Sequence, residues 1–296
     1  MSGSQELLGK TTETSKDRVQ REAVKQLHAK NGHGIIAGAT GVGKTKIAID
    51  YITSLGDVKV LWVVPTTTLR DIGIPDEWSK WGHAKYFSKN VKAICYRSLH
   101  KETNYYHVVV LDEGHNITKR AYLGKTTFDR RYGSMIFLSA TVPREKIKRK
   151  IMKHARLTVA ARVSVDDAVD LGLVAPFKVH VIPVPMGKKN DFKVKTKDGK
   201  RYTTSEHNRY YALQNRINQF PRGKAPVPLY LARMHSIYRF KSKLAAARKL
   251  LQRLQGRRTL IFCGSIAVAE SLADYTYHSK TDLGDYKAFN EKKIDH

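Results

Sequence analysis

Short apolar runs alternate with amphipathic segments through the first half of the chain. The apolar runs have strand length and occupy residues 34–37, 58–64, 91–96, 107–111 and 134–138. Helical spacing of apolar residues separates most of them, as at residues 44–53 and 69–81. Continuous apolar runs are typical of strands buried on both faces, and alternation with helices favours parallel pairing. The pattern therefore predicts an α/β fold with a mainly parallel sheet flanked by helices.

The two ends of this first region are less regular. Residues 1–14 are polar and are predicted to form a flexible tail. We expect Ser15 to cap a helix that continues through Leu27 and ends at Asn31-Gly32. The domain is predicted to close near residue 170, which gives a first domain over residues 15–170.

The second half of the chain predicts the opening of another α/β domain, incomplete, over residues 171–296. Strand-like runs cover residues 177–184 and 260–263, and helical patterns cover residues 206–218, 229–254 and 266–273. The apolar side chains expected to face the core from the long helix are Leu244, Leu250, Leu251 and Leu254. A basic insertion interrupts this domain near residues 187–205.

Residues 38–45 match the phosphate-loop pattern GxxxxGK[ST]. Glycines let backbone amides turn inward around phosphate oxygens, and the following helix directs the positive end of its dipole at the same anion. In such a loop Lys44 contacts the β- and γ-phosphates and the Thr45 hydroxyl ligates Mg²⁺. The alternative is a plain glycine-rich turn, but a predicted strand enters and a helix leaves. The residues predicted to bind ATP·Mg²⁺ are Gly38, Ala39, Thr40, Gly41, Val42, Gly43, Lys44 and Thr45.

A second motif, Asp112-Glu113-Gly114-His115, follows the apolar run that ends at Leu111. Adjacent side chains at a strand end point in different directions, so one carboxylate can face a metal while the other faces a water. Asp112 is predicted to hold Mg²⁺, directly or through water. Glu113 is predicted to orient and deprotonate the water that attacks the γ-phosphate. A solvated surface pair is the alternative. Residues 38–45 do not have the GxGxxG pattern of Rossmann dehydrogenases, so that class of enzyme is excluded.

Charge points to a polyanionic partner. Lys and Arg number 54 against 26 Asp and Glu, a formal net charge of +28, and the part after residue 171 is the more basic. Nucleic acid is the commonest partner of so basic a protein, and a ribosome-like or unspecifically adhesive protein is the alternative.

The remaining composition excludes several classes of protein. The chain has two cysteines, Cys95 and Cys263, and no CxxC pair, which argues against a zinc site or a disulfide framework. No apolar signal segment or membrane-length run is found, so we expect a cytoplasmic protein of a bacterium or phage-infected cell. Trp62, Trp78 and Trp81 are interpreted as core or surface anchors without a chemical role.

Taken in order, the motifs resemble those of superfamily 2 helicases, most closely the type III restriction motor subunits and phage DNA helicases. The further matching segments are residues 18–20 (Q-motif), 63–70 (motif Ia), 95–100, 139–141, 260–265 (motif IV) and 277–280. The resemblance implies a RecA-like P-loop NTPase domain followed by the start of a second RecA-like domain.

The same resemblance implies residue roles. Gln20 reads the adenine edge, and Ser139 and Thr141 link the nucleotide state to domain movement. His115 either senses the γ-phosphate or makes a structural hydrogen bond. The residues implied in contacts with the nucleic-acid backbone are Thr66, Thr67, Arg70, Arg97, Ser98, Ser265, Ser279 and Lys280. Hydroxyls and arginines are good phosphate donors, although a helix cap or a surface position is the alternative for several of them.

The basic insertion has a hairpin signature. Asp198-Gly199 predicts a two-residue type I′ turn, and lysines alternate with apolar or small residues before it. The lysines predicted to track a phosphate backbone or to wedge open a duplex are Lys193, Lys195, Lys197 and Lys200. A solvated, mobile hairpin is the alternative.

We interpret the sequence as the core of an ATP-dependent DNA helicase or translocase. The alternatives are the motor subunit of a restriction or nuclease complex, an RNA helicase, and an ATP-gated DNA-binding module without catalysis. Motifs V and VI of the resembled family are not found, so its arginine finger, worth about 10³ to 10⁵ in rate, is expected from a downstream part or a partner chain. We expect residues 1–296 alone to bind ATP but to hydrolyse it slowly.

Overall fold

The computed structural model describes residues 14–118, 132–195, 199–278 and 281. Its contacts divide the chain into two compact units, Met1–Lys178 and Val179–His296. Each unit is described by itself. The predicted tail, residues 1–14, lies outside the described residues except for Thr14.

The first unit is built on a six-stranded sheet in the order β3-β2-β4-β5-β1-β6, and all its neighbouring strands are parallel. The strands are β1 (Gly34–Gly38), β2 (Val60–Val64), β3 (Val91–Cys95), β4 (Tyr106–Leu111), β5 (Tyr132–Ser139) and β6 (Thr158–Val163). The first five confirm the predicted apolar runs, whereas β6 was not predicted. The prediction of a parallel α/β sheet is therefore confirmed for this unit.

Alternation along the strands sends side chains into two separate cores. One core joins Ile36, Trp62 and Val110 to helices on one face of the sheet, including Ile47 of α2 and Trp78 of α3. The other core lies on the opposite face and contains the intervening strand residues together with α6. Burial on both faces explains why these strands have continuous apolar sequences.

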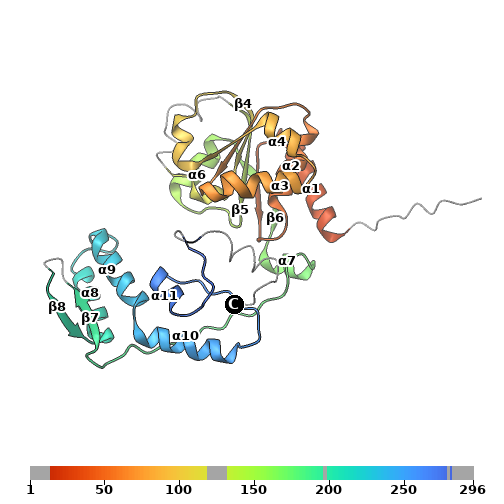
Figure 1. Cartoon of the computed structure of the whole chain (residues 1–296). Coiled ribbons are helices and arrows are strands. Elements are labelled where there is room, and N and C mark those ends of the chain that lie inside the picture. The colour runs from red at the N-terminus through yellow and green to blue at the C-terminus, as the bar shows by residue number, and fades with distance from the viewer. Residues whose placement is uncertain (1–13, 119–131, 196–198, 279–280, 282–296) are drawn as a thin grey trace, which may run out of the picture. The chain divides into compact units, whose positions relative to one another are not determined.

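Helices connect the strands of the first unit (Figure 1). Their bounds are α1 (Ser15–Ala29), α2 (Lys44–Ser54), the π-helical turn η1 (Leu69–Gly73), α3 (Ile74–Lys80), α4 (Ala84–Asn90), the 3₁₀ turns η2 (Tyr96–Lys101) and η3 (Gly114–Asn116), α6 (Lys146–His154) and α7 (Val165–Asp170). The expected cap of α1 was wrong by one residue. Thr14, not Ser15, accepts the hydrogen bond from the Asp17 amide, and Asp17 completes a capping box.

The second unit has a small core under a hairpin. Strands β7 (Phe192–Lys195) and β8 (Arg201–Thr204) pair antiparallel. Phe192 and Val194 pack against Phe240, with the Phe192 and Phe240 rings 5.5 Å apart edge to face. The helices are α8 (Glu206–Asn218), α9 (Val227–Tyr238), α10 (Lys241–Arg253) and α11 (Ile266–Glu270).

Several predictions for this half of the chain were wrong. Residues 177–184 and 260–263 form no strands, and Phe262 is 91% exposed. The predicted helix over residues 229–254 is two helices, interrupted at Arg239 and Phe240. No residue of α10 is buried, so its leucines do not form the expected core face. Within the described residues, these apolar segments are largely exposed and do not form a core.

No helix within the described residues is both long and apolar enough to cross a membrane.

Candidate functional site

The residues predicted to bind and hydrolyse ATP lie at one edge of the six-stranded sheet. All its strands run parallel, so their carboxyl ends share an edge. The phosphate loop follows β1 and the acidic pair follows β4, while β5, which lies between them, ends at Ser139. Segments that are far apart in the sequence are thereby brought to one place.

The phosphate loop is anchored by its apolar side chains. Ala39 and Val42 are buried against Ala168 of α7, and the Ala39 amide donates to the Val163 carbonyl at 3.2 Å. Thr40 and Gly41 remain exposed at the rim. Gly43 precedes α2 with φ of 84°, a left-handed conformation that favours glycine.

Two buried polar side chains hold the loop in place. The Lys44 ammonium group donates to the carbonyls of Gly38 at 3.0 Å and Ala39 at 3.4 Å. The Gln20 side-chain amide, from α1, donates to the Val42 carbonyl at 3.0 Å. In this arrangement Gln20 supports the back of the loop. Thr45 lies on the first turn of α2 and is partly exposed.

Asp112 continues the alternation of β4 and faces the side of the sheet that α2 covers. Burial raises the pKa of its carboxyl group, and the nearby charge of Glu113 adds to the rise. The hydrogen bond from Trp62 and the positive charge of Lys44 act in the opposite direction without cancelling it. Lys44 makes the smallest of these contributions, and its direction agrees with a phosphate loop and an acidic pair at the same sheet edge.

Glu113 and its neighbours form a tight turn after β4. Glu113 has φ of 46° and ψ of 51°, which turns the chain sharply away from the strand. The next residue has to be glycine, because a Cβ atom at Gly114 would lie 2.5 Å from the ring of Phe137 on β5. The turn that carries the glutamate is therefore seated directly on the core.

His115 connects this turn to the end of β5. Its Nδ1 atom lies 3.3 Å from Oε2 of Glu113 and 3.3 Å from the hydroxyl of Ser139. Ser139 is fully buried and accepts a hydrogen bond from the Thr141 amide at 3.4 Å. Ser139 thus contacts both His115 and Thr141, and His115 also contacts the predicted base.

The sequence of the first unit is similar to a known family. Residues 13–144 match the family model described as "Type III restriction enzyme, res subunit". The match covers less than half of the chain and includes the phosphate loop and the acidic pair. No curated protein matched the chain.

Solved structures with detectable similarity are distant. They include the Sulfolobus solfataricus SWI2/SNF2 ATPase core in complex with dsDNA (14% identity, 86% of this chain and 67% of that chain, TM-score 0.39). A nuclease-deletion mutant of the Type ISP restriction-modification enzyme LlaGI with a DNA substrate mimic has 12% identity over 96% of this chain and 31% of that chain, with a TM-score of 0.39. The Pyrococcus furiosus Hef helicase domain has 14% identity over 83% and 56%, with a TM-score of 0.38.

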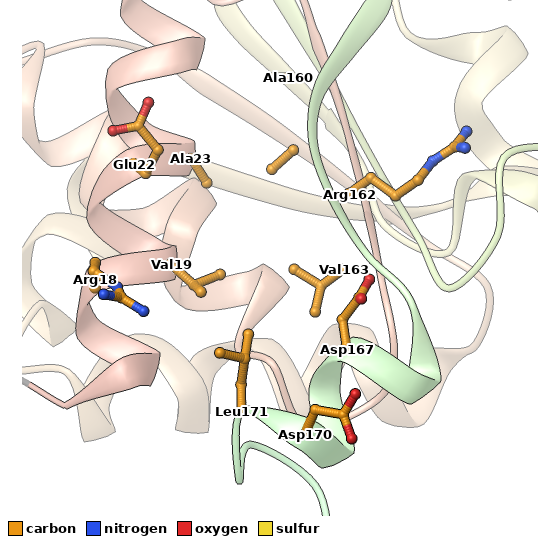
Figure 2. A pocket seen from close by; sticks show the side chains of 11 residues that line it. Arg18, Val19, Glu22, Ala23, Ala160, Arg162, Val163, Asp167, Asp170 and Leu171 are labelled. Atoms are coloured by element: carbon orange, nitrogen blue, oxygen red, sulfur yellow. The ribbon is translucent and has the colours of Figure 1, made fainter.

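A cleft lies beside the phosphate loop of the first unit, between α1 on one side and β6 and α7 on the other. Its volume is about 680 Å³. Figure 2 shows Val19 of α1 directed toward Val163 and Leu171 on the opposite wall. Charged side chains also line the cleft, from Arg18, Glu22, Arg162, Asp167 and Asp170. β6 flanks β1 on the side away from β4, so the cleft lies on that side too.

In the first unit, the residues predicted to contact a nucleic-acid backbone lie beyond β4 along the same edge. Thr66 and Thr67 follow β2, and Arg97 and Ser98 follow β3; all four are exposed. Arg70 already has a partner, because its guanidinium group donates to the Asp71 carboxylate at 2.6 and 2.8 Å. A phosphate would have to compete with Asp71 for it.

The second unit carries the other predicted contacts. Lys193 and Lys195 are exposed on β7 and pair in register with Thr203 and Arg201 of β8. Lys200 is also exposed. The described pairing runs as far as Lys195 and Arg201, and the predicted turn at Asp198-Gly199 lies partly outside the described residues. Ser265 caps α11 by accepting from the Val268 amide at 3.4 Å. The predicted residues outside the described part are Lys197, Asp198, Ser279 and Lys280.

Sequence interpretation missed Trp62 and Tyr96. The Trp62 indole N–H donates to Oδ2 of Asp112 at 3.3 Å, and the Tyr96 hydroxyl donates to the Asp112 carbonyl at 2.8 Å. Both residues lie in apolar runs, which predict core positions, and both are buried in a core. A polar atom on an otherwise apolar ring was the signal available in the sequence.

Proposed function

We propose that this chain is the ATP-binding and hydrolysing core of a DNA helicase or translocase. The observation that carries the proposal is that the phosphate loop after β1 and the acidic pair after β4 lie at the same edge of the sheet, on either side of β5. A cationic loop and a pair of carboxylates at that edge suit a triphosphate and its attacking water. The match of residues 13–144 to a helicase-like family supports it.

In this mechanism the loop amides and Lys44 bind the phosphates. Glu113 accepts the proton of the attacking water, and its turn, packed on Phe137, keeps the carboxylate in position. His115 stands between Glu113 and Ser139, so it can couple the base to the end of β5. That coupling is the part of the mechanism that would report the nucleotide state to another domain.

The residues present fit Mg²⁺. Asp112 and Thr45 offer hard oxygen ligands, and Mg²⁺ at phosphate-transfer sites is held by one or two protein oxygens together with phosphates and waters. No cluster of three or more His, Cys, Asp or Glu side chains occurs among the described residues, and such a site does not need one. When bound, Mg²⁺ neutralises charge on the phosphate oxygens.

The cleft beside α1 is the proposed site of the nucleoside. A triphosphate whose terminal phosphate faces Asp112 must extend away from β4, and the cleft lies on that side of β1. Its apolar walls suit a heterocyclic base, and its charged rim suits hydrogen bonds to the base and sugar. Gln20 follows Val19, which lines the cleft, and hydrogen-bonds to the loop at Val42; it is the proposed contact to adenine.

DNA is the proposed partner. The exposed hydroxyls and Arg97 after β2 and β3, together with the cationic face of the hairpin, form no sequence-reading pattern and suit phosphate contacts. RNA has the same phosphate chemistry, so binding of matched DNA and RNA strands decides between the two. A motor subunit of a restriction complex is the second candidate, favoured by the name of the matching family.

Replacing Glu113 by Gln tests the proposal. This change keeps the shape of the side chain but removes the proton acceptor, so hydrolysis of ATP should fall by about 10² to 10⁴. Nucleotide binding, measured by fluorescence with a labelled analogue, should be retained. The control is Glu77→Gln, which lies on α3 and interacts with Lys80 and Trp81.

The outcomes separate the candidate functions. Hydrolysis that survives Glu113→Gln unchanged would remove Glu113 as the base. Tight ATP binding with no hydrolysis in the native chain, even with DNA present, would favour an ATP-gated binding module.

A further inference from the structure

Two buried tryptophans occupy the same core but differ in one contact. Trp62 on β2 and Trp78 on α3 are both fully buried, and their rings lie 5.8 Å apart edge to face. The Trp62 indole N–H donates to Oδ2 of Asp112 at 3.3 Å. The indole nitrogen of Trp78 has no hydrogen-bond partner among the described residues. The same side chain is therefore used in two ways within one cluster.

Asp112 is also held by its backbone. Its amide donates to the Val63 carbonyl at 2.9 Å, and its carbonyl accepts from the Tyr96 hydroxyl at 2.8 Å. Tyr96 is buried, and burial together with the charges of Asp112 and Glu113 raises the pKa of its hydroxyl well above the usual value, so it stays a donor. These bonds fix the backbone of Asp112, and the Glu113 amide also hydrogen-bonds to the Asp112 carboxylate.

Trp62 is the side-chain donor to the Asp112 carboxylate. In the parallel pair β2–β4 the register places Trp62 opposite Val110. Asp112 is two residues further along, so the Trp62 ring and Asp112 lie diagonally on the same face of the sheet. The Trp62 N–H, which donates to Oδ2, therefore favours one orientation of the carboxylate.

We propose that Trp62 is a positioning residue that orients the Asp112 carboxylate toward the Mg²⁺–nucleotide complex. The inference rests on the proposed function, because it assumes that Asp112 is the carboxylate that holds the metal. Residues that hydrogen-bond to a metal ligand commonly change metal affinity by 10- to 100-fold when they are replaced. A tryptophan inside an apolar strand would then act on the metal without touching it.

The comparison of Trp62→Phe with Trp78→Phe tests this proposal. Each change keeps an aromatic ring in the core and removes one indole, but only the first removes a bond to Asp112. The readout is the Mg²⁺ concentration that gives half-maximal tightening of nucleotide binding, measured with a fluorescent ATP analogue. We expect this concentration to rise about tenfold in Trp62→Phe and to stay at the native value in Trp78→Phe. Nucleotide affinity without metal should be equal in both.

A third variant, Asp112→Asn, separates the positioning role of Trp62 from the metal-binding role of Asp112. If Asp112→Asn raises the Mg²⁺ requirement and Trp62→Phe does not, the positioning role is wrong and the proposed function stands. If Asp112→Asn leaves the Mg²⁺ requirement unchanged, the assignment of Asp112 as the metal carboxylate is wrong, and the role of Trp62 falls with it.

A measurement with Trp62 intact covers the case in which Trp62→Phe does not fold. The chain has three tryptophans, so the variant Trp78→Phe/Trp81→Phe retains a single indole N–H, that of Trp62. Its ¹⁵N–¹H resonance should shift when Mg²⁺ is added to the complex with ADP, beyond the shift produced by ADP alone. An indole resonance that does not respond to Mg²⁺ would overturn the proposal.

Discussion

The sheet edge of the first unit and the hairpin of the second unit use charge in opposite ways. At the sheet edge, Lys44 and Asp112 are enclosed by the fold, and each has specific partners at defined distances. On the hairpin, Lys193 and Lys195 are exposed on one face of a two-stranded sheet. An enclosed charge acts through its exact position, whereas exposed charges act through their sum and are screened by salt. Substitutions in the two regions should therefore have effects of different kinds.

The largest effect is expected from Lys44→Ala. It removes a cation that lies inside the phosphate loop, and loss of one preorganised donor costs about 10² to 10³ in rate. The measurement is ATP hydrolysis together with nucleotide affinity. Lys46→Ala is the matched control, because Lys46 lies on the same helix and pairs with Asp50 instead. Equal losses in both variants would mean that general charge, not position, governs this edge.

A smaller and salt-dependent effect is expected from Lys193→Glu/Lys195→Glu. If the hairpin binds a phosphate backbone, the slope of log affinity for DNA against log salt should become shallower by roughly 0.7 to 0.9 for each phosphate that is no longer neutralised. The control is Lys249→Glu/Arg253→Glu on α10, which makes the same change in net charge. The same change of slope in both would assign the effect to the overall field of the unit.

The smallest effect is expected from Glu206→Gln, which tests what holds the hairpin in place. Glu206 is buried and accepts from the Gly187 amide at 2.8 Å and from the Ser242 amide and hydroxyl at 3.0 and 2.5 Å. Burial alone would raise its pKa, but these hydrogen bonds outweigh it and lower the pKa. Loss of the charge should reduce local stability by roughly 1 to 3 kcal/mol, read from hydrogen exchange of α8 and α10 in the full chain.

The pH dependence of this interaction follows from the direction of the pKa shift. A group whose pKa is lower in the folded state stabilises the fold above its unfolded pKa, near 4.3 for glutamate. That stabilisation is lost as the pH falls through the lower folded value. Glu206→Gln should therefore weaken protection at neutral pH and remove the acid-dependent part of it. The control Asp191→Asn, at an exposed pair with Lys241, should leave protection nearly unchanged.

The sequence predicted the first unit well because each of its central strands is buried on both faces. An apolar run such as residues 107–111 then has one interpretation, and the motif that follows it is placed at the correct edge by the parallel topology. β6 was missed because its side chains are only partly buried at the edge of the sheet, so its pattern is weak. Gln20 was expected to contact the adenine ring. Its hydrogen bond to the Val42 carbonyl was not predicted, because no motif specifies that contact.

The second unit was predicted poorly for the converse reason. The apolar character of Phe262 and its neighbours has no burial to explain it in the described residues, so pattern and structure disagree there. The break between α9 and α10 was missed because helical periodicity continues across Phe240, whose ring instead packs under the hairpin. Trp62 was taken for a core residue without chemistry. The hydrogen bond between the Trp62 indole and Asp112 depends on the register of β2 and β4, and the composition of the chain does not specify that register.

The packing of Gly114 on Phe137 ties the position of the proposed base to a volume inside the core. A methyl group at 114 and a phenyl ring at 137 would occupy the same space. Any larger residue at position 114 is therefore compatible with this turn only when position 137 becomes smaller, and the two sites are constrained as a pair. A change in the core at position 137 therefore affects the turn that carries the proposed base, and a change in that turn affects the core.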